Sequence, residues 1–205
     1  EGSTSITGTL AGAAAGGQLD VTVIPGPTAG APAPTTAAAD VEAVVFSGAT
    51  GYVQDPINTY RAGFSVATLT QIQIAGNDTL LYGSLDFVGI EHVGANSLDV
   101  SASTVLHMDI WTPNAIQFSI KLVDFGADNA FGGGDDTEHQ VNLSTANGDF
   151  TQSGWVSLDL PLSSFTGLTN RANLSQMILV GRTDDGQGNP VRGLTTVFVD
   201  NIYYY

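Results

Sequence analysis

The stretch that decides the fold is residues 105–138, VLHMDIWTPNAIQFSIKLVDFGADNAFGGGDDTE. It begins at 105–111 with seven residues that can all be buried on one sheet face or the other, is interrupted at Pro113, and continues at 116–122, where apolar and polar residues alternate without a break. Alternation with a period of two is the pattern of a strand with one face in a core and one in water. Because Pro113 has no N–H to give to a ladder, the chain is expected to turn there. The two runs are therefore predicted to pair as an antiparallel hairpin.

A loop rich in glycine and carboxylates follows the second run. Its consecutive glycines at 132–134 carry a large entropic cost of ordering, which indicates that something holds the loop in place. Calcium suits such a loop because it takes about six to eight oxygen ligands, from both carboxylates and backbone carbonyls. The spacing is not that of an EF-hand loop, so the alternative is a solvated acidic loop. The candidate ligands are Asp124, Asp128, Asp135, Asp136 and Glu138.

Strand signals recur from residue 40 to residue 205 at the short spacing of an all-β sandwich, and no long helix is predicted. Two segments precede this domain. Residues 25–39, PGPTAGAPAPTTAAA, are predicted to be a linker, because they bury too little apolar surface to fold alone. Residues 1–24 contain a predicted strand at 18–24 and are either the remnant of a preceding module or a detachable strand. The other strands are predicted at 41–47, 68–75, 79–82, 87–93, 139–143, 155–160, 174–180 and 195–205.

The composition excludes several classes of partner. Lys and Arg total 5 against 20 Asp and Glu, which gives a formal net charge of −15. Nucleic acids and anionic membrane surfaces need a basic patch, and a neutral glycan is a more natural ligand. No run approaches the roughly 18 apolar residues of a membrane span. The few lysines and many small polar residues favour an extracellular, secreted or cell-surface protein of bacterial type.

Four motifs carry a resemblance to a known class of domain. They are HMDIWTP (107–113), KLVDFG with GGGDDTEH (121–126 and 132–139), WVSLDLPLSSFTGL (155–168) and VFVDNIYYY (197–205). In this order, over residues 40–205, they resemble the jelly-roll, galactose-binding-like β-sandwich modules that bind carbohydrate and are appended to bacterial glycoside hydrolases. The resemblance implies a structural calcium site near Asp200, completed by oxygens at the end of the first strand, near Ser47. Gly48 stands where relatives often have an acidic residue, and Asp55 is the expected substitute.

Sugar binding needs aromatic rings, which pack on the C–H faces of pyranoses, and polar groups for the hydroxyls. Trp111 and Asp109 share one face of their predicted strand; the alternative for Trp111 is a place in the core. The loop after the first strand offers further candidates, since loops often carry binding residues. The predicted ligand-binding residues are Tyr52, Tyr60, Arg61, Phe64, Asp109 and Trp111.

Catalytic signals are weak. A glycosidase needs two carboxylates about 5–10 Å apart, for which Asp109 with Glu91 or Asp86 is the available set, and no acidic run lies on one strand face. The three histidines lack metal-binding spacing. The predicted function is a non-catalytic, calcium-stabilised module that binds a neutral polysaccharide and targets a parent glycoside hydrolase. The alternative is a structural cell-surface or matrix protein, in which residues 1–36 form an arm that docks on the next subunit.

Overall fold

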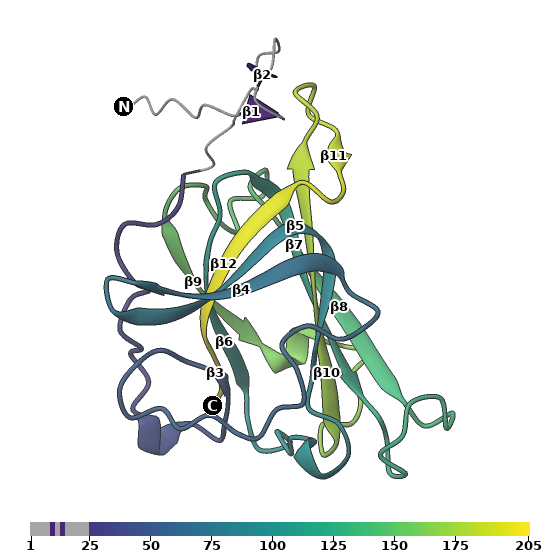
Figure 1. The fold of residues 1–205 in the computed structure, drawn as a ribbon. Helices are drawn as coiled ribbons and strands as arrows, with labels where there is room; N and C mark the ends of the chain where they lie inside the picture. Colours follow the sequence, from purple (N-terminus) through teal and green to yellow (C-terminus); the bar gives the residue numbers. More distant parts are fainter. Residues whose placement is uncertain (1–8, 11–12, 15–24) are drawn as a thin grey trace.

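The computed structural model describes residues 9–10, 13–14 and 25–205, which form almost only β-structure (Figure 1). One antiparallel ten-stranded sheet contains the order β8-β7-β10-β5-β12-β6-β9, with β11 beside β10, β3 beside β12 and β4 beside β5. The predicted all-β sandwich is therefore confirmed. The strands of this sheet are β3 (Ala43–Phe46), β4 (Val66–Ile74), β5 (Asn77–Glu91), β6 (Val105–Trp111), β7 (Ala115–Asp124), β8 (Thr137–Ser144), β9 (Trp155–Pro161), β10 (Leu174–Asp184), β11 (Pro190–Val191) and β12 (Thr195–Tyr204).

The remaining elements are small. Three 3-10 helices, η1 (Ala38–Asp40), η2 (Gly94–Asn96) and η3 (Leu162–Ser164), lie between strands. A separate two-stranded ribbon joins β1 (Thr9–Leu10) to β2 (Ala13–Ala14). In the part of the chain that the structure describes, no helix is long and apolar enough to cross a membrane. The strand predicted at 18–24 lies outside the described residues.

The strand β5 joins the two layers of the sandwich. Its first part pairs with β12, through Leu80–Val199 and Leu85–Thr195, and its last part pairs with β10, from Phe87–Val180 to Glu91–Gln176. Ser84, with a positive φ of 48°, lies at the irregularity of the β5–β12 pairing between Tyr82 and Leu85, just before the strand changes its partner. The sequence predicts two strands here, at 79–82 and 87–93. One continuous strand forms instead.

The core lies between the layers and is built from the inward side chains of nearly every strand. Phe118, Leu179, Val88 and Tyr204 are among its fully buried members. The strand β10, predicted to be buried on both faces, alternates instead: Leu179 is buried, and its outward neighbours are half-exposed. Close packing between β10 and the β5–β12 junction requires Gly181, because a Cβ there would lie 2.9 Å from Thr195 Cγ2.

The connection after β6 does not form the predicted hairpin. The strand β6 pairs with β12 and β9, whereas β7 pairs with β10 and β8, so the chain crosses from one layer to the other between them. Thr112 holds this corner: its hydroxyl donates to the carbonyl of Thr196 (2.7 Å) and accepts from the N–H of Ala115 (2.9 Å). Asn114 accepts from the N–H of Thr196 (3.0 Å) through its side chain. These bonds attach the corner to β12, so Pro113 marks a crossing rather than a hairpin turn.

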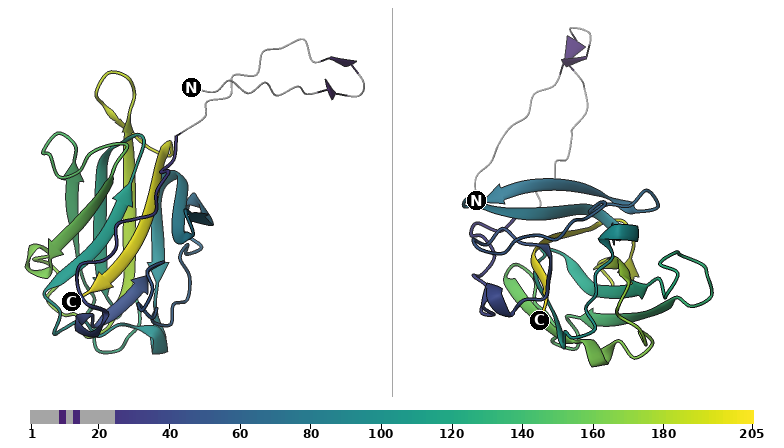
Figure 2. Two further views of the ribbon diagram at one scale, coloured as in Figure 1. Left: turned by 90° about the vertical axis from the view of Figure 1, so that its left-hand side faces the viewer. Right: turned by 90° about the horizontal axis from the view of Figure 1, so that it is seen from below.

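Residues 25–37, predicted to be a linker, lie along the outer face of the layer that contains β12, β6 and β9; we call this segment the strap (Figure 2). Side chains of the sheet donate to its carbonyls. Trp155 Nε1 donates to Ala29 O (2.8 Å), Asn201 Nδ2 donates to Pro32 O (3.0 Å), and the Tyr52 hydroxyl donates to Thr36 O. The strap is therefore part of the sandwich, because side chains outside the strap supply hydrogen-bond donors for its carbonyls.

The corner at Thr112 generates a prediction on stability. Replacing Thr112 by Val keeps the shape of the side chain but leaves the buried carbonyl of Thr196 and N–H of Ala115 without their partner. The free energy of unfolding should fall by about 2–4 kcal/mol, as measured by urea unfolding. Thr112→Ser keeps the hydroxyl and should lose clearly less; equal losses for the two variants would contradict the role given to these hydrogen bonds.

Candidate functional site

The layer formed by β8, β7, β10 and the end of β5 has an uncovered outer surface, which we call the open face (Figure 1). The alternation of side chains along each strand decides which residues point outward on this face. The register places Lys121 beside Ile178 and Ser119 beside Val180, and it places Val180 in turn beside Phe87. Because residues opposite one another in antiparallel strands point the same way, these side chains form rows across the face. Ile178, Val180 and Phe87 are half-buried, so an apolar strip runs along the middle of the open face.

An aromatic pair completes this strip. Phe64, from the loop before β4, stacks on Phe87 with ring centroids 6.5 Å apart and an interplanar angle of 17°. Its ring lies over Gly89, where a Cβ would collide with it. Gly89 therefore allows the ring to lie flat on the sheet. Phe64 remains 46% exposed, so it offers a ring to a ligand.

Charged and amide groups surround the apolar strip. Lys121 Nζ lies 2.6 Å from Glu138 Oε1, and Arg182 Nη1 lies 2.7 Å from Asp86 Oδ1. Gln176 Nε2 donates to Glu91 Oε1 (2.9 Å). Each of these pairs fixes the direction of a donor and an acceptor, which keeps the polar rim ordered before a ligand arrives.

The far side of the open face, over β7 and β8, is hollowed. Asn142 Oδ1 accepts hydrogen bonds from Ser119 Oγ (2.8 Å) and Gln140 Nε2 (2.6 Å), which leaves the Asn142 amide N–H groups free of a partner among the described residues. A pocket of about 240 Å³ lies beside them, lined by Gln117, Ser119, Asn142, Leu143, Ser144 and Asn147. An apolar strip with a ring at one side and amides at the other suits a sugar, which has apolar C–H faces and an equatorial set of hydroxyls.

The predicted ligand-binding residues are divided between different parts of the molecule. Phe64 lies on the open face, and Arg61 lies close by in the same loop, where its guanidinium donates to the carbonyls of Ala67 (2.7 Å) and Ser65 (3.3 Å). Tyr60 packs edge-on against Phe46, and its hydroxyl donates to the carbonyl of Val45 (3.1 Å). Only Phe64 is presented to a ligand there.

Asp109 and Trp111 face the strap, not solvent, and the prediction that they line an open surface is wrong. Asp109 is 1% exposed and accepts from Asn201 Nδ2 (2.7 Å), and Trp111 is 6% exposed and packs on Phe198. Tyr52, whose ring packs against Tyr203 at a tilt of 34°, holds the end of the strap. The strap covers this face, so these residues act in packing rather than in binding a sugar.

The acidic loop between β7 and β8 uses many of its carboxylate oxygens internally. Asp124 is fully buried and accepts from the N–H groups of Gly126 and Asn173 (2.8 Å each). Among the residues that the structure describes, no three acidic, His or Cys side chains form a group that could hold a metal ion. The second oxygens of Asp128 and Asp135 both lie against Gly133, without a hydrogen-bond donor in the described chain. They are the pair best placed for a cation. Asp136 accepts from Gly132 N (2.7 Å), and Glu138 pairs with Lys121.

The arrangement around Asp200 does not fit the calcium site that the resemblance implied. Ser47 and Asp200 lie close together as expected, since Ser47 Oγ donates to Asn201 Oδ1 (2.6 Å). The carboxylate of Asp200, however, accepts from the N–H groups of Gly48 (2.9 Å) and Asn201 (2.7 Å) and from the Asn77 amide. Donors therefore occupy the oxygens that a cation would use. Burial is the main cause that raises the pKa of Asp200.

Asp55 has a different role from the one expected. Its carboxylate accepts from the N–H of Val44 (2.7 Å), and its own N–H donates to the carbonyl of Val44 (2.8 Å). Asp55 thus forms hydrogen bonds with both backbone groups of Val44 at the outer edge of β3.

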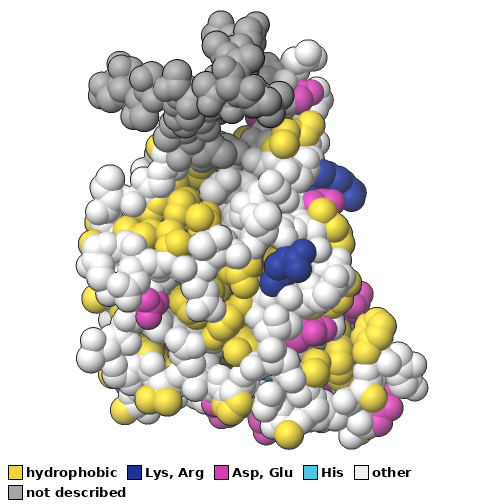
Figure 3. Space-filling model, viewed as in Figure 1, with side chains coloured by type: hydrophobic (Ala, Val, Ile, Leu, Met, Phe, Trp, Pro, Cys, Tyr) yellow, Lys and Arg dark blue, Asp and Glu magenta, His cyan; other side chains and the backbone are white. Residues whose placement is uncertain are grey.

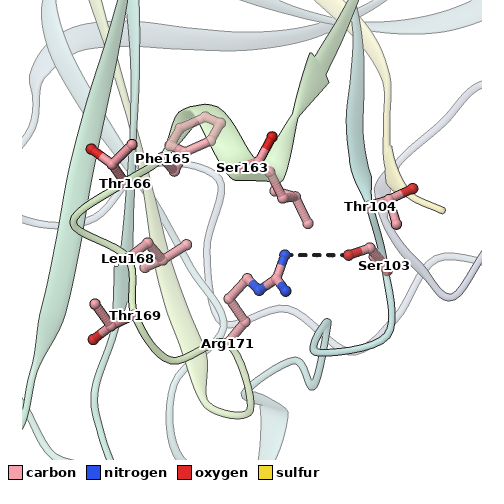
Figure 4. Close-up of a pocket in the computed structure, with 9 residues that line it drawn as sticks. Ser103, Thr104, Ser163, Phe165, Thr166, Leu168, Thr169 and Arg171 are labelled. Atoms are coloured by element: carbon pink, nitrogen blue, oxygen red, sulfur yellow. Dashed lines mark hydrogen bonds between the residues drawn. The ribbon is translucent and has the colours of Figure 1, made fainter.

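A second hollow lies at the end of the sandwich, between the β9–β10 connection and the segment before β6 (Figure 4). Its volume is about 470 Å³, and Arg171 Nη1 in its wall donates to the carbonyl of Ser103 (3.3 Å). Hydroxyl groups surround an apolar floor. The lining residues are Ser103, Thr104, Leu162, Ser163, Phe165, Thr166, Leu168, Thr169 and Arg171. Sequence reasoning missed this hollow, because its lining comes from segments far apart in the chain, 103–104 and 162–171.

The surface charge agrees with the composition. The face of the molecule shown in Figure 3 carries basic side chains that are separated from one another, one of them beside acidic atoms, and no basic patch. With a formal net charge of −15, the protein has no surface on this face that suits a nucleic acid.

The fold is that of known carbohydrate-binding modules. The family 30 module of a cellulosomal cellulase of Clostridium thermocellum matches with a TM-score of 0.50 and 15% identity over 79% of this chain and 91% of that chain. A family 11 module of another cellulosomal cellulase of this organism matches with a TM-score of 0.51 and 13% identity over 78% and 93%. No family model and no curated protein matches the sequence. The resemblance predicted from the motifs is thus confirmed at the level of the fold.

The covered face generates a prediction on pH. Burial acts to lower the pKa of His107, but hydrogen bonds to Asp109 and Asp159 outweigh it and raise the pKa above its ordinary value of 6.5. A raised pKa in the folded state means that protonated His107 stabilises the fold fully below pH 6.5, and that this contribution is lost as pH rises through the folded-state pKa. His107→Gln should therefore lower the free energy of unfolding more at pH 6 than at pH 9, as measured by urea unfolding.

The Asp159→Asn variant serves as its control. Asp159 Oδ1 lies 2.7 Å from His107 Nδ1, so this change removes one carboxylate partner of the imidazole. It should therefore reduce the part of the free energy of unfolding that differs between pH 6 and pH 9. A loss for His107→Gln that is the same at both pH values would show that only packing against Tyr203 matters.

Proposed function

We propose that the chain is a non-catalytic carbohydrate-binding module that holds a polysaccharide on the open face. The observation that carries this proposal is the exposed ring of Phe64, stacked on Phe87 beside Ile178 and Val180 and bordered by ordered polar pairs. Rings provide the apolar contact for a pyranose, and the fixed donors and acceptors around it meet the hydroxyls. The fold shared with modules of cellulosomal cellulases supports the same class of ligand.

A neutral glycan suits the open face best. Lys121 and Arg182 on this face are already paired with Glu138 and Asp86, so neither is left for a carboxylate or sulfate on the ligand. The formal net charge of −15 also repels a polyanion. The ligand we propose is an uncharged, extended polysaccharide that lies across β10 and β7.

A purely binding role agrees with the surroundings of the carboxylates, which have hydrogen-bond or ion-pair partners both beneath the strap and on the open face. The predicted glycosidase pair requires Asp109, which lies beneath the strap and accepts hydrogen bonds from Asn201 and Ser157. On the open face, Glu138, Asp86 and Glu91 each have a cation or an amide as partner. In our proposal the module acts by attaching a parent glycoside hydrolase, outside the cell, to its substrate. Tethering raises the local concentration of the enzyme without any chemistry by the module.

Binding is tested by thermal unfolding with a panel of soluble neutral and acidic glycans, followed by calorimetric titration of those that stabilise. A ligand at 100 times its Kd should add about 2.7 kcal/mol to the free energy of unfolding. Phe64→Ala removes the exposed ring and should weaken binding by about tenfold, which corresponds to about 1.4 kcal/mol.

Phe131→Ala is the matched control, because Phe131 is also an exposed phenylalanine (72%) but lies in the acidic loop. This variant should bind as the wild type does. If no glycan shifts the unfolding temperature, or if the two variants bind equally well, the open face is not the site.

Calcium belongs to the proposal as a stabiliser of the acidic loop, bound at Asp128 and Asp135. Their free oxygens both lie beside Gly133, and like charges placed near each other repel unless a cation lies between them. Added calcium should raise the unfolding temperature relative to EDTA, and Asp135→Asn should remove that rise.

Asp185→Asn is the control for this variant, since Asp185 lies in another exposed loop and accepts from Gln187 N and Asn189 N within it. It should keep the calcium response. Identical unfolding curves in calcium and EDTA for the wild type would show that the loop is simply solvated.

A further inference from the structure

The strap limits which part of the N-terminal segment is able to reach another molecule. Residues 29, 32 and 36 are bonded to the sandwich of their own chain, through Trp155, Asn201 and Tyr52. At its other end, Gly26 lies against the ring of Phe198 in β12, so close that a Cβ would be 3.2 Å from the ring. An arm made of residues 1–36 is therefore too long: only residues before 25 are available to a neighbour.

Most edges of the sheet are protected against pairing with another strand. Asp55 occupies the backbone groups of Val44 on β3. The edge strand β8 carries Glu138, and the edge strand β9 carries Asp159 and ends at Pro161. Charges, prolines and covering groups are the usual means by which proteins prevent edge strands from associating.

The edge strand β4 lacks this protection. Its nine residues, VATLTQIQI, contain no charge and no proline, and β5 is its single strand partner in the described sheet. Arg61 occupies the carbonyl of Ala67 at its beginning. From Thr68 to Ile74, the described chain supplies no backbone hydrogen bond to the free side. Leu69 and Ile72 are half-exposed on its two faces, so a further strand would also bury apolar surface.

We propose that β4 accepts residues 18–24 of a second copy as an added strand. This segment, QLDVTVI, alternates apolar and polar residues and is predicted from the sequence to be a strand. Strand addition to a free edge derives its affinity from main-chain hydrogen bonds, and alternate side chains add specificity. The segment has a single acidic residue and no proline, so nothing in it opposes pairing with the uncharged β4 edge.

The geometry favours a second copy over the same chain. Gly26 lies on β12, and in the described sheet β5 and β4 separate β12 from the free edge. A strand added there would lie three strand spacings from β12, about 14 Å. An extended chain needs about four residues to cross that distance. Residues 22–25 would then form the crossing and would be unable to pair, whereas the segment of a neighbour pairs over its whole length.

The contact joins two different surfaces, the segment of one copy and the β4 edge of the next. A head-to-tail contact of this kind leaves a free segment at one end and a free edge at the other, so it closes into a ring or continues as a filament. The open face is on the other layer and is left uncovered.

Two full-length variants with complementary defects test this contact. Val21→Pro removes an N–H and the extended pairing of the segment but leaves β4 intact. Thr70→Lys/Gln71→Lys places charges on both faces of the exposed edge but leaves the segment intact. Light scattering after size-exclusion chromatography should show a mass that rises with concentration for the wild type and the mass of one chain for each variant. An equimolar mixture of the two variants should form one-to-one dimers, because one intact segment meets one intact edge.

Matched controls separate this contact from general effects. Thr4→Pro and Ser163→Lys/Gln187→Lys make the same chemical changes outside the contact and should assemble as the wild type does. Thermal unfolding of every variant checks that the sandwich is intact. A wild type that is monomeric at all concentrations, variants that still assemble, or a mixture that stays monomeric would each overturn the proposal.

Discussion

The structure depends on the way a single strand divides its hydrogen bonds. The strand β5 gives its first half to β12 and its last half to β10, so one continuous ladder serves both layers. Backbone N–H and C=O groups buried in a sandwich must be paired, and β5 stays paired as it passes from one partner strand to the other. The outer strands of the two layers follow this division: β6 and β9 lie beyond β12, and β7 and β8 lie beyond β10. The two outer faces of the molecule follow from it as well.

Much of the fold was predictable because alternation is a local property. The strands at 105–111, 116–122 and 155–160 were found within about one residue of β6, β7 and β9 at most of their ends. The way in which these strands pair was not predictable from the sequence. A proline between two strands gives the same local signal in a hairpin and in a crossing between layers. The hydroxyl of Thr112 decides between them by bonding to Thr196, 84 positions away. No pattern within a window of the sequence contains that information.

The candidate site was found in part, for a similar reason. Phe64 was predicted because loops often carry binding residues, but the same argument selected Tyr52 and Tyr60, whose rings pack against Tyr203 and Phe46. Trp111 and Asp109 were not predicted to be covered, because alternation shows which residues face away from the core but not that another segment lies over them. The Pro/Ala/Thr segment that does so has no apolar pattern of its own, and its attachment depends on donors such as Trp155 from the sheet. Lys121 and Arg182 became part of a site only through the register that sets them beside their carboxylates.

The strap has a mechanical consequence. It runs beside β12 in the same direction as that strand, from Gly26 at Phe198 to Thr36 near Tyr203 (Figure 2). A force that pulls the N-terminal side of the chain away past the beginning of β12 acts along the length of the strap. The three hydrogen bonds at Ala29, Pro32 and Thr36 are then loaded together, in shear. A pull in the opposite direction opens the same bonds one after another, as in unzipping. The molecule therefore resists tension differently along the two directions of one strand.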